Sequence, residues 1–210
     1  MDIIKSLEWR YASKKFDNTT IISDDKVARL CEAFNLTATS YGLQPLKLIV
    51  LKNKELQLKM QSAAFNQSQV STASHVLIIC IEKTIDKAFI DAYFEQMRKI
   101  RPNQEDGISS YQKVLTERFE NKSNEELKLW ATKQAYIALG NLLTVCAVEQ
   151  IDTCPMEGFL PSEVDSLLKL DDKNLSSVLL LPIGYRDKND IGANEEKVRR
   201  PLSEIIETIF

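Results

Sequence analysis

"HVLIICI", residues 75–81, is the stretch from which the fold can be read. It is apolar after its first residue and rich in β-branched side chains, with no alternation of polar and apolar positions. Such a run is typical of a strand that is buried on both faces of a sheet. "SVLLLPIG", residues 177–184, has the same character, and "LKLIVL", residues 46–51, also predicts a strand. A sheet that is covered on both sides needs helices on both faces.

Apolar residues at helical spacing predict those helices, and capping residues mark where several of them begin. They are expected at residues 2–9, 23–34, 54–64, 85–101, 108–120, 123–150 and 161–168. The chain contains no internal repeat, low-complexity tract or linker-like segment. We therefore expect one α/β (α+β) domain that spans residues 1–210, with a small sheet between layers of helices.

The longest predicted helix begins with the capping box "SNEE", residues 123–126, and continues to about residue 150. It is apolar on most of its sides, and it carries several alanines together with Gly140, which would permit close helix approach. A helix that is apolar all round is a buried one. The sequence therefore places this helix either in the core or in a subunit interface.

Composition excludes several classes of protein. The 210 residues carry a net charge of −3, so a nucleic-acid-binding protein is not expected. No apolar run is long enough to span a bilayer, and the first residues lack the apolar region of a signal peptide. The four cysteines form no CxxC pair, which indicates free thiols in a reducing compartment. We therefore expect a cytoplasmic protein with no membrane or nucleic-acid partner.

Common catalytic and nucleotide-binding motifs are also missing. His75 is the only histidine, so a histidine-rich metal site is impossible, and no metal is expected. The sequence contains neither GxGxxG nor GxxxxGK. A Rossmann fingerprint and a P-loop are therefore both excluded, and any bound nucleotide would need another way to hold its phosphate.

Two basic clusters lie near opposite ends of the chain, in "RYASKKF", residues 10–16, and in "KVRRP", residues 197–201. Arginine offers phosphate a planar fork of donors, and lysine offers it a mobile point charge. If the two ends of the chain meet, the clusters would make a phosphate clamp that needs no glycine loop. Spacing alone leaves open the alternative that each cluster is solvated surface.

Three polar stretches could complete such a site. "CPMEGF", residues 154–159, predicts an irregular loop whose backbone N–H groups could face a flat ring. "AAFNQSQV", residues 63–70, carries amides that suit a pyrimidine edge, and "ATSYGLQP", residues 38–45, is a turn of small and hydroxyl residues. Each could instead be an ordinary connection between secondary-structure elements.

Taken in order along the chain, these five stretches resemble the FMN-dependent nitroreductase family, and most closely its oxygen-insensitive NAD(P)H nitroreductase and flavin reductase branch. The resemblance covers roughly residues 2–205. It implies a nitroreductase-like fold with a small central mixed β-sheet and a long buried central helix. It also implies an obligate homodimer with flavin sites at the interface, and FMN as the bound cofactor.

The resemblance also implies roles for individual residues. Arg10, Lys197 and Arg199 would hold the FMN phosphate, and Lys14 would lie near the N1–C2=O edge of the flavin. Asn66 would hydrogen-bond to the pyrimidine ring of the flavin, and the N–H groups of Glu157 and Gly158 would face flavin N5 and O4. Thr39 and Ser40 would come from the partner subunit. The remaining candidate cofactor-binding residues are Tyr11, Ala12, Ser13, Gly42, Gln69, Pro155 and Met156. No side chain is expected to be catalytic, because flavin N5 carries the hydride.

Two residues depart from the family's usual pattern. Ala12 replaces a common serine, and Ser13 is the candidate to restore that phosphate contact. Gln69 stands where some relatives have a lysine, which could shift the flavin potential or the acceptor range.

The implied function is an oxidoreductase with a ping-pong cycle. NADH or NADPH would reduce the flavin, which would then reduce a small-molecule electron acceptor such as a nitroaromatic, a quinone or a free flavin. The alternatives are a dihydropteridine or enone reductase on the same fold, an FMN-binding protein without turnover, and a flavin-free protein with basic surface clusters. Residues 100–122 are expected to form a helical lid that selects the acceptor, with Tyr111 and Phe119 as candidates.

Overall fold

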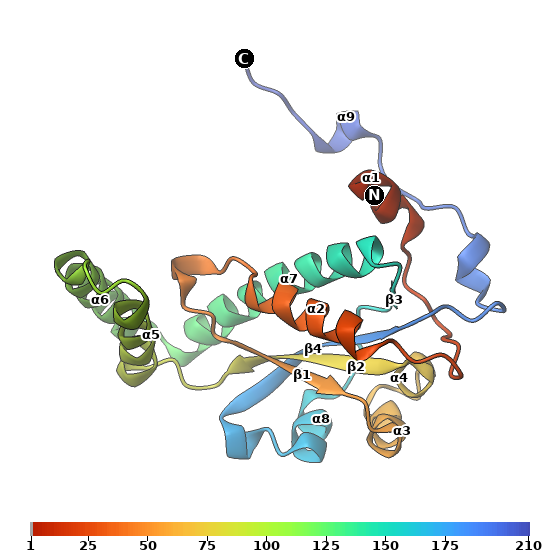
Figure 1. Ribbon diagram of the computed structural model, residues 1–210, viewed down its shortest axis with the longest axis horizontal. Helices are drawn as coiled ribbons and strands as arrows, with labels where there is room; N and C mark the ends of the chain where they lie inside the picture. The colour runs from red at the N-terminus through yellow and green to blue at the C-terminus, as the bar shows by residue number, and fades with distance from the viewer. Residues whose placement is uncertain (1) are drawn as a thin grey trace.

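A computed structural model describes residues 2–210 of the chain. Its helices and strands, in chain order, are α1 (Ile3–Trp9), α2 (Asp24–Asn35), the 3-10 turn η1 (Ser40–Gly42), β1 (Leu46–Leu51), α3 (Lys54–Ala63), α4 (Gln69–Thr72), β2 (His75–Glu82), α5 (Lys87–Ile100), α6 (Glu105–Glu120), α7 (Asn124–Val148), β3 (Asp152–Thr153), α8 (Pro161–Leu168), η2 (Asp171–Lys173), β4 (Leu175–Gly184), η3 (Ile191–Asn194) and α9 (Leu202–Ile205). Figure 1 shows helices on both faces of a sheet, with the hairpin of α5 and α6 projecting from one end and the C-terminal segment extending away. None of the helices within residues 2–210 is both long and apolar enough to cross a bilayer.

The sheet has four strands in the order β1-β2-β4-β3. All three predicted strands are present, and the two-residue strand β3 is an addition that the sequence did not mark. The predicted mixed sheet needs a correction, because every pairing between these strands is antiparallel. Within residues 2–210, parallel pairing is confined to an isolated bridge between Ala12 and Thr153. The N-terminal segment, and not a strand–helix–strand crossover, supplies the parallel contact.

The central strand β2 is buried on both faces, as its composition predicts. Leu77, Ile79 and Ile81 belong to one apolar core, together with side chains from α2, α5, α6 and α7. Val76 and Ile78 belong to a second core, which includes side chains from α3 and α8. Figure 1 shows α2 and α7 on one side of the sheet and α3 and α8 on the other. Successive residues of a strand point to opposite faces, which explains how one apolar run serves both cores.

The long helix α7 begins at the predicted capping box. The N–H of Glu126 donates to Ser123 Oγ at 3.2 Å, and the N–H of Ser123 donates to Glu126 Oε2 at 2.8 Å. One side of the helix is buried against the sheet, but Leu129, Tyr136 and Ile137 on the other side are about half exposed. The expected burial all round is therefore incomplete in a single chain.

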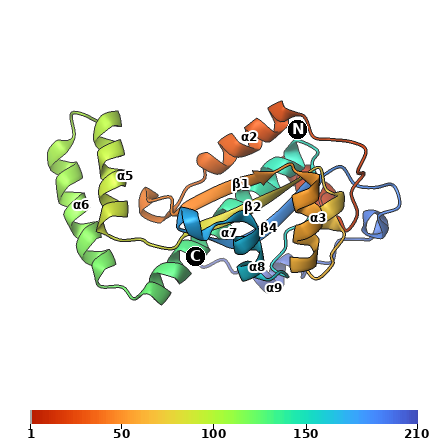
Figure 2. The ribbon, with the colours of Figure 1, turned by 90° about the horizontal axis from the view of Figure 1, so that it is seen from below.

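Helices α5 and α6 form a hairpin that stands apart from the sheet (Figures 1 and 2). Arg98 joins the two helices, since its Nε lies 3.0 Å from Glu105 Oε2 and its Nη2 donates to Gln112 Oε1 at 2.8 Å. Gln112 Nε2 in turn donates to Asp91 Oδ1 at 2.7 Å. The predicted lid, residues 100–122, is the outer half of this hairpin, and Phe119 is buried while Tyr111 is partly exposed.

His75 is buried at the start of β2, where it is held as a neutral ring. The Ser74 hydroxyl accepts from the N–H of Ile22 at 2.8 Å and lies 2.9 Å from His75 Nδ1. With its oxygen used as an acceptor, the hydroxyl is available to donate to an unprotonated Nδ1. Burial lowers the pKa of His75, and the neighbouring Lys52 and Lys54 lower it further.

We expect His75 to make the folded state sensitive to acid. Below the ordinary pKa of 6.5, the unfolded chain binds a proton that the folded chain does not bind. As the pH is lowered, the free energy of unfolding therefore falls by up to about 1.4 kcal/mol per pH unit, until folded His75 is itself protonated. Urea unfolding at about pH 7.5 and about pH 5.5 measures this loss, which should be smaller in His75→Gln. An equal loss in both proteins would contradict the assignment.

Candidate functional site

The two basic clusters meet in the structure. A cavity of about 670 Å³ lies between the end of α1 and the segment around η3, and Arg10, Lys14, Lys197 and Arg199 all line it. Lys197 Nζ donates to the backbone oxygen of Leu7 at 2.9 Å and also to that of Arg10. The predicted convergence of the two chain ends is therefore present. The role of these residues as a phosphate clamp stays a prediction.

Four cations line the cavity, and three carboxylates, Glu8, Glu195 and Glu196, share its wall. None of Arg10, Lys14, Lys197 and Arg199 forms an ion pair with a carboxylate within residues 2–210. Burial and then the charge of Arg199 lower the pKa of Arg10. Burial, Arg10 and Arg199 lower the pKa of Lys197. These cations repel one another, and an anion in the cavity would relieve that repulsion.

Asp190 ties the two chain ends together. This buried carboxylate accepts from the N–H groups of Lys14 at 2.8 Å, Lys15 at 3.2 Å and Gly192 at 3.2 Å. Sequence reasoning did not single out Asp190. The only available signal was local, because an aspartate just before a short helical turn is a common cap. Its contacts with residues 14 and 15 are long-range and cannot be read from the local pattern.

Several polar atoms around the cavity lack a partner. Arg10 Nε, Tyr11 Oη and Ser13 Oγ are buried and make no hydrogen bond within the part of the chain that the structure describes. Buried donors without acceptors are uncommon and call for an explanation. A ligand rich in acceptor oxygens would satisfy Arg10, which lines the cavity.

Ala12 and Ser13 differ in their position relative to the cavity. Ala12 lines the cavity. Ser13 is completely buried and is not among the lining residues, while its N–H donates to the backbone oxygen of Thr153 at 3.0 Å. The expectation that Ser13 replaces the missing serine contact is therefore not supported by its position. The bridge between Ala12 and Thr153 turns the side chain after it toward the core.

Next to the cationic cavity, two of the polar stretches lie side by side. Lys14 Nζ is 3.8 Å from Cys154 Sγ. The buried Gln69 donates through Nε2 to Gln67 Oε1 at 2.9 Å, and Gln67 Nε2 donates to the backbone oxygen of Gly158 at 2.9 Å. Asn66 is exposed in the same loop and has a left-handed backbone, with φ of 58°. Sequence reasoning singled out these three amides but missed the contact of Cys154 with Lys14.

The loop at residues 155–158 is fixed at both ends. Met156 exchanges backbone hydrogen bonds with Leu180 of β4 at 2.8 and 3.1 Å, next to the partly buried Pro155. Glu157 Oε1 accepts from the hydroxyl of Tyr136 on α7 at 2.7 Å. The N–H groups of Glu157 and Gly158 have no acceptor within residues 2–210, so they are free to bind a ligand.

The turn that carries Thr39, Ser40 and Gly42 lies elsewhere. The N–H of Ser40 donates to Gln134 Oε1 on α7 at 2.8 Å. Gly42 has a φ of 72°, and a β-carbon there would lie 2.6 Å from the hydroxyl oxygen of Tyr93 on α5. These residues do not line the cationic cavity. One chain alone therefore does not bring this turn to the other predicted site residues.

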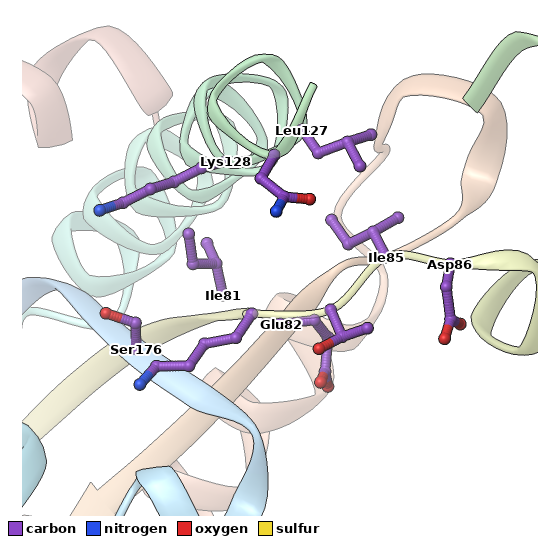
Figure 3. A pocket seen from close by; sticks show the side chains of 10 residues that line it. Ile81, Glu82, Ile85, Asp86, Leu127, Lys128 and Ser176 are labelled. Carbon is purple, nitrogen blue, oxygen red and sulfur yellow. The ribbon is translucent and has the colours of Figure 1, made fainter. Parts of the chain in front are cut away.

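A second cavity, of about 360 Å³, lies between the end of β2 and the start of α7 (Figure 3). Ile81, Ile85 and Leu127 give it apolar walls, and Lys128 and Ser176 stand at its edge. None of the predicted site residues lines it. The predicted site is the cationic cavity and not this one.

Comparison with known proteins identifies relatives over nearly the whole chain. The sequence profile of the Nitroreductase family matches residues 7–185. A Staphylococcus haemolyticus protein, provisionally named an NAD(P)H nitroreductase, is 32% identical over 219 residues, which cover 99% of this chain and 97% of that protein. A Bacillus subtilis crystal structure provisionally described as a nitroreductase superimposes with a TM-score of 0.87 at 20% identity, over 98% of both chains. An Exiguobacterium sibiricum structure, provisionally described as a nitroreductase in complex with FMN, has a TM-score of 0.84 at 20% identity, over 100% of this chain and 98% of that one.

Proposed function

This chain belongs to the nitroreductase family, and we propose that it is an FMN-dependent NAD(P)H oxidoreductase that reduces small, electron-poor acceptors. One observation carries the proposal: four cations from opposite ends of the chain line one cavity, and within residues 2–210 none of them is ion-paired, even though three glutamates share the wall. A relative with the same fold is described as a complex with FMN. A cationic cavity of this kind suits the FMN phosphate, and the adjacent loops suit a flat ring with polar edges.

The residues present fit FMN at both ends of the molecule. Arg10, Lys197 and Arg199 would hold the phosphate, which would give the unpartnered Arg10 Nε an acceptor. Lys14 lies between the cavity and the loop at residues 154–158, because its Nζ contacts Cys154 Sγ. The free N–H groups of Glu157 and Gly158 would donate to the ring edge.

FMN, when bound, would accept a hydride from NAD(P)H and pass the reducing equivalents to the acceptor in a ping-pong cycle. The chain's own contribution is to bind and orient. Lys14 supplies a positive charge that stabilises negative charge on the nearby ligand edge. Gln67 and Gln69 fix the spacing between the amide loop and Gly158 through their two hydrogen bonds. We assign no general acid or base among the side chains of this site.

The acceptor class is proposed as nitroaromatics, quinones or free flavins, and enones or dihydropteridines are the alternatives. The α5–α6 hairpin is the proposed selector. It stands away from the sheet in both views, and its outer half carries the partly exposed Tyr111 (Figures 1 and 2). Steady-state rates with one nitroaromatic, one quinone and one enone would rank these classes.

A homodimer is part of the proposal. The C-terminal segment extends away from the body in Figure 1, and it is exposed throughout. The exposed side of α7 and the exposed residues Ile3 and Ile4 of α1 add further apolar surface. A second copy would cover these surfaces, and it could bring its Thr39 turn to the site that lacks one. Apolar surface of this extent usually marks an interface.

We expect the protein to elute with the mass of two 23.9 kDa chains in size-exclusion chromatography with light scattering. Ile137→Arg places a charge on the exposed side of α7 and should yield monomers that also lose FMN. Leu58→Arg is the matched control, because Leu58 is exposed on α3, on the far side of the sheet. A wild-type monomer at micromolar concentration would refute the dimer.

The visible absorption spectrum of the purified protein tests the central proposal. We expect a flavin band that bleaches when NADH or NADPH is added without oxygen, which also compares the two reductants. A band that persists with both reductants would leave only a flavin-binding protein. If no band is present and added FMN causes no spectral shift, the proposed function is wrong.

A further inference from the structure

Arg186 lies between two aromatic rings just before the cationic cavity. Its guanidinium carbon is 4.3 Å from the centre of the Trp9 ring and 4.5 Å from that of Tyr11. Arginine over an aromatic face is attracted by the negative face of the ring, and its plane can stack on it. Trp9 and Tyr11 line the cavity, whereas Arg186 does not. Arg186 therefore contacts two residues of the cavity wall without itself lining the cavity.

A buried carboxylate fixes the position of Arg186. Asp152 of β3 is 4% exposed, and its Oδ1 accepts from Arg186 Nε at 2.8 Å and lies 2.6 Å from Arg186 Nη2. Its Oδ2 accepts from the backbone N–H of Arg186 at 2.8 Å. Residue 186 also pairs with Phe16 in an isolated antiparallel bridge. Asp152 thus holds the guanidinium through Oδ1, while Oδ2 and the bridge to Phe16 hold the backbone of residue 186.

Arg10 is the residue between Trp9 and Tyr11 in the sequence, and it lines the same cavity as they do. Its backbone is extended, with φ of −71° and ψ of 143°. A backbone of this kind is close to polyproline II, in which successive side chains point about 120° apart. Arg199 lines the cavity as well. Gly192 supports the same arrangement, since a β-carbon there would lie 3.0 Å from the Tyr11 ring.

The packing around Arg186 can hold the mutually repelling cations of the cavity in place. Arg10, Lys197 and Arg199 repel one another, so a free segment would swing Arg10 outward and lose the arrangement that an anion needs. A segment that is held by packing keeps the cations in place before the ligand arrives, and preorganisation of this kind raises affinity.

We propose that Arg186 is a positioning residue that holds Arg10 in the clamp through the Trp9–Arg186–Tyr11 stack, so that the preference for FMN over riboflavin depends on it. The inference rests on the proposed function. Riboflavin has the same ring system as FMN but lacks the phosphate that Arg10 would bind. A residue that acts only through Arg10 should therefore affect FMN and leave riboflavin nearly unchanged.

The test is fluorescence titration of the flavin-free protein with FMN and with riboflavin. The double variant Asp152→Asn/Arg186→Met removes both partners of the buried pair and keeps the net charge constant. Trp9→Leu removes one ring and leaves the pair intact. In both variants, we expect the Kd for FMN to rise by at least about tenfold, the effect of one misaligned hydrogen bond to a charged group, and the Kd for riboflavin to change less than about twofold. Arg29→Met, which removes an arginine that pairs with Glu149 on the surface, is the control.

The outcomes separate this inference from the proposed function. If the wild-type protein binds no FMN, the proposed function fails. If the wild-type protein prefers FMN and both variants keep that preference, Arg186 does not position Arg10. If both flavins weaken equally in the variants, the stack has only a general structural role, and the inference is also overturned.

Discussion

Arg10→Glu is expected to leave the purified protein without a flavin band and to weaken FMN binding by at least about 100-fold. A loss of this size follows when one partner of a buried charge pair is replaced by a charge that repels the other. Arg10 is central among the cations of the cavity. It lies beside Arg199, and its backbone oxygen accepts from Lys197. The substitution removes a phosphate donor and puts a carboxylate in its place.

The matched control is Lys188→Glu. Lys188 is exposed on the loop before Asp190 and does not line the cavity, but the substitution changes the net charge by the same amount. We expect it to retain bound FMN with an affinity within about twofold of the wild-type value, because exposed charges act weakly at a distance. Equal losses in the two variants would show that the effect comes from overall charge. Retention of FMN by Arg10→Glu would show that Arg10 is not part of the clamp.

The two-sided sheet could be predicted because its signals are local and strong. The run at residues 75–81 is apolar at every position after His75, and both faces of β2 are in fact buried. The capping box at Ser123 fixed the start of α7 to the residue. The pairing of the strands could not be predicted in the same way. Strand direction depends on where the chain returns after long connections, and the only parallel contact within residues 2–210 is the bridge from Ala12.

The candidate site also combines features that local sequence signals predict with features that depend on long-range contacts. Arginines and lysines at both ends of the chain marked the clamp, and they do converge. Asp190 was missed, because it matters only through partners far away in the sequence. Whether Ala12 or Ser13 faces the cavity could not be read from the sequence for a related reason: adjacent residues of an extended segment face opposite sides.

Arg186 was missed as well, and no local motif marks it. Its partners are Asp152, Trp9 and Tyr11, and only the fold brings them to the end of β4. Because these long-range contacts meet at Arg186, the stability of the fold is sensitive to substitution of this residue. The stack and the buried carboxylate join the N-terminal segment, β3 and the end of β4 at a single side chain.

Arg186→Met is expected to lower the free energy of unfolding by about 3 kcal/mol, because it leaves a buried carboxylate without its counter-charge. Asp152 is 4% exposed, so water cannot replace the lost partner. The value lies at the lower end of the range for such pairs, since the Arg186 side chain is 24% exposed. Urea unfolding at one fixed protein concentration measures it.

Asp152→Asn/Arg186→Met should recover most of that loss. The double variant has no buried charge, and the side-chain oxygen of the introduced asparagine can still accept from the backbone N–H of residue 186, as Asp152 does at 2.8 Å. Replacing both partners of a buried ion pair is often nearly neutral, whereas removing one is not. A double variant as unstable as Arg186→Met would show that the lost stability comes from the aromatic stack and not from the unpaired charge. A stable single variant would show that Asp152 finds another partner, and that the pair does not secure the end of β4.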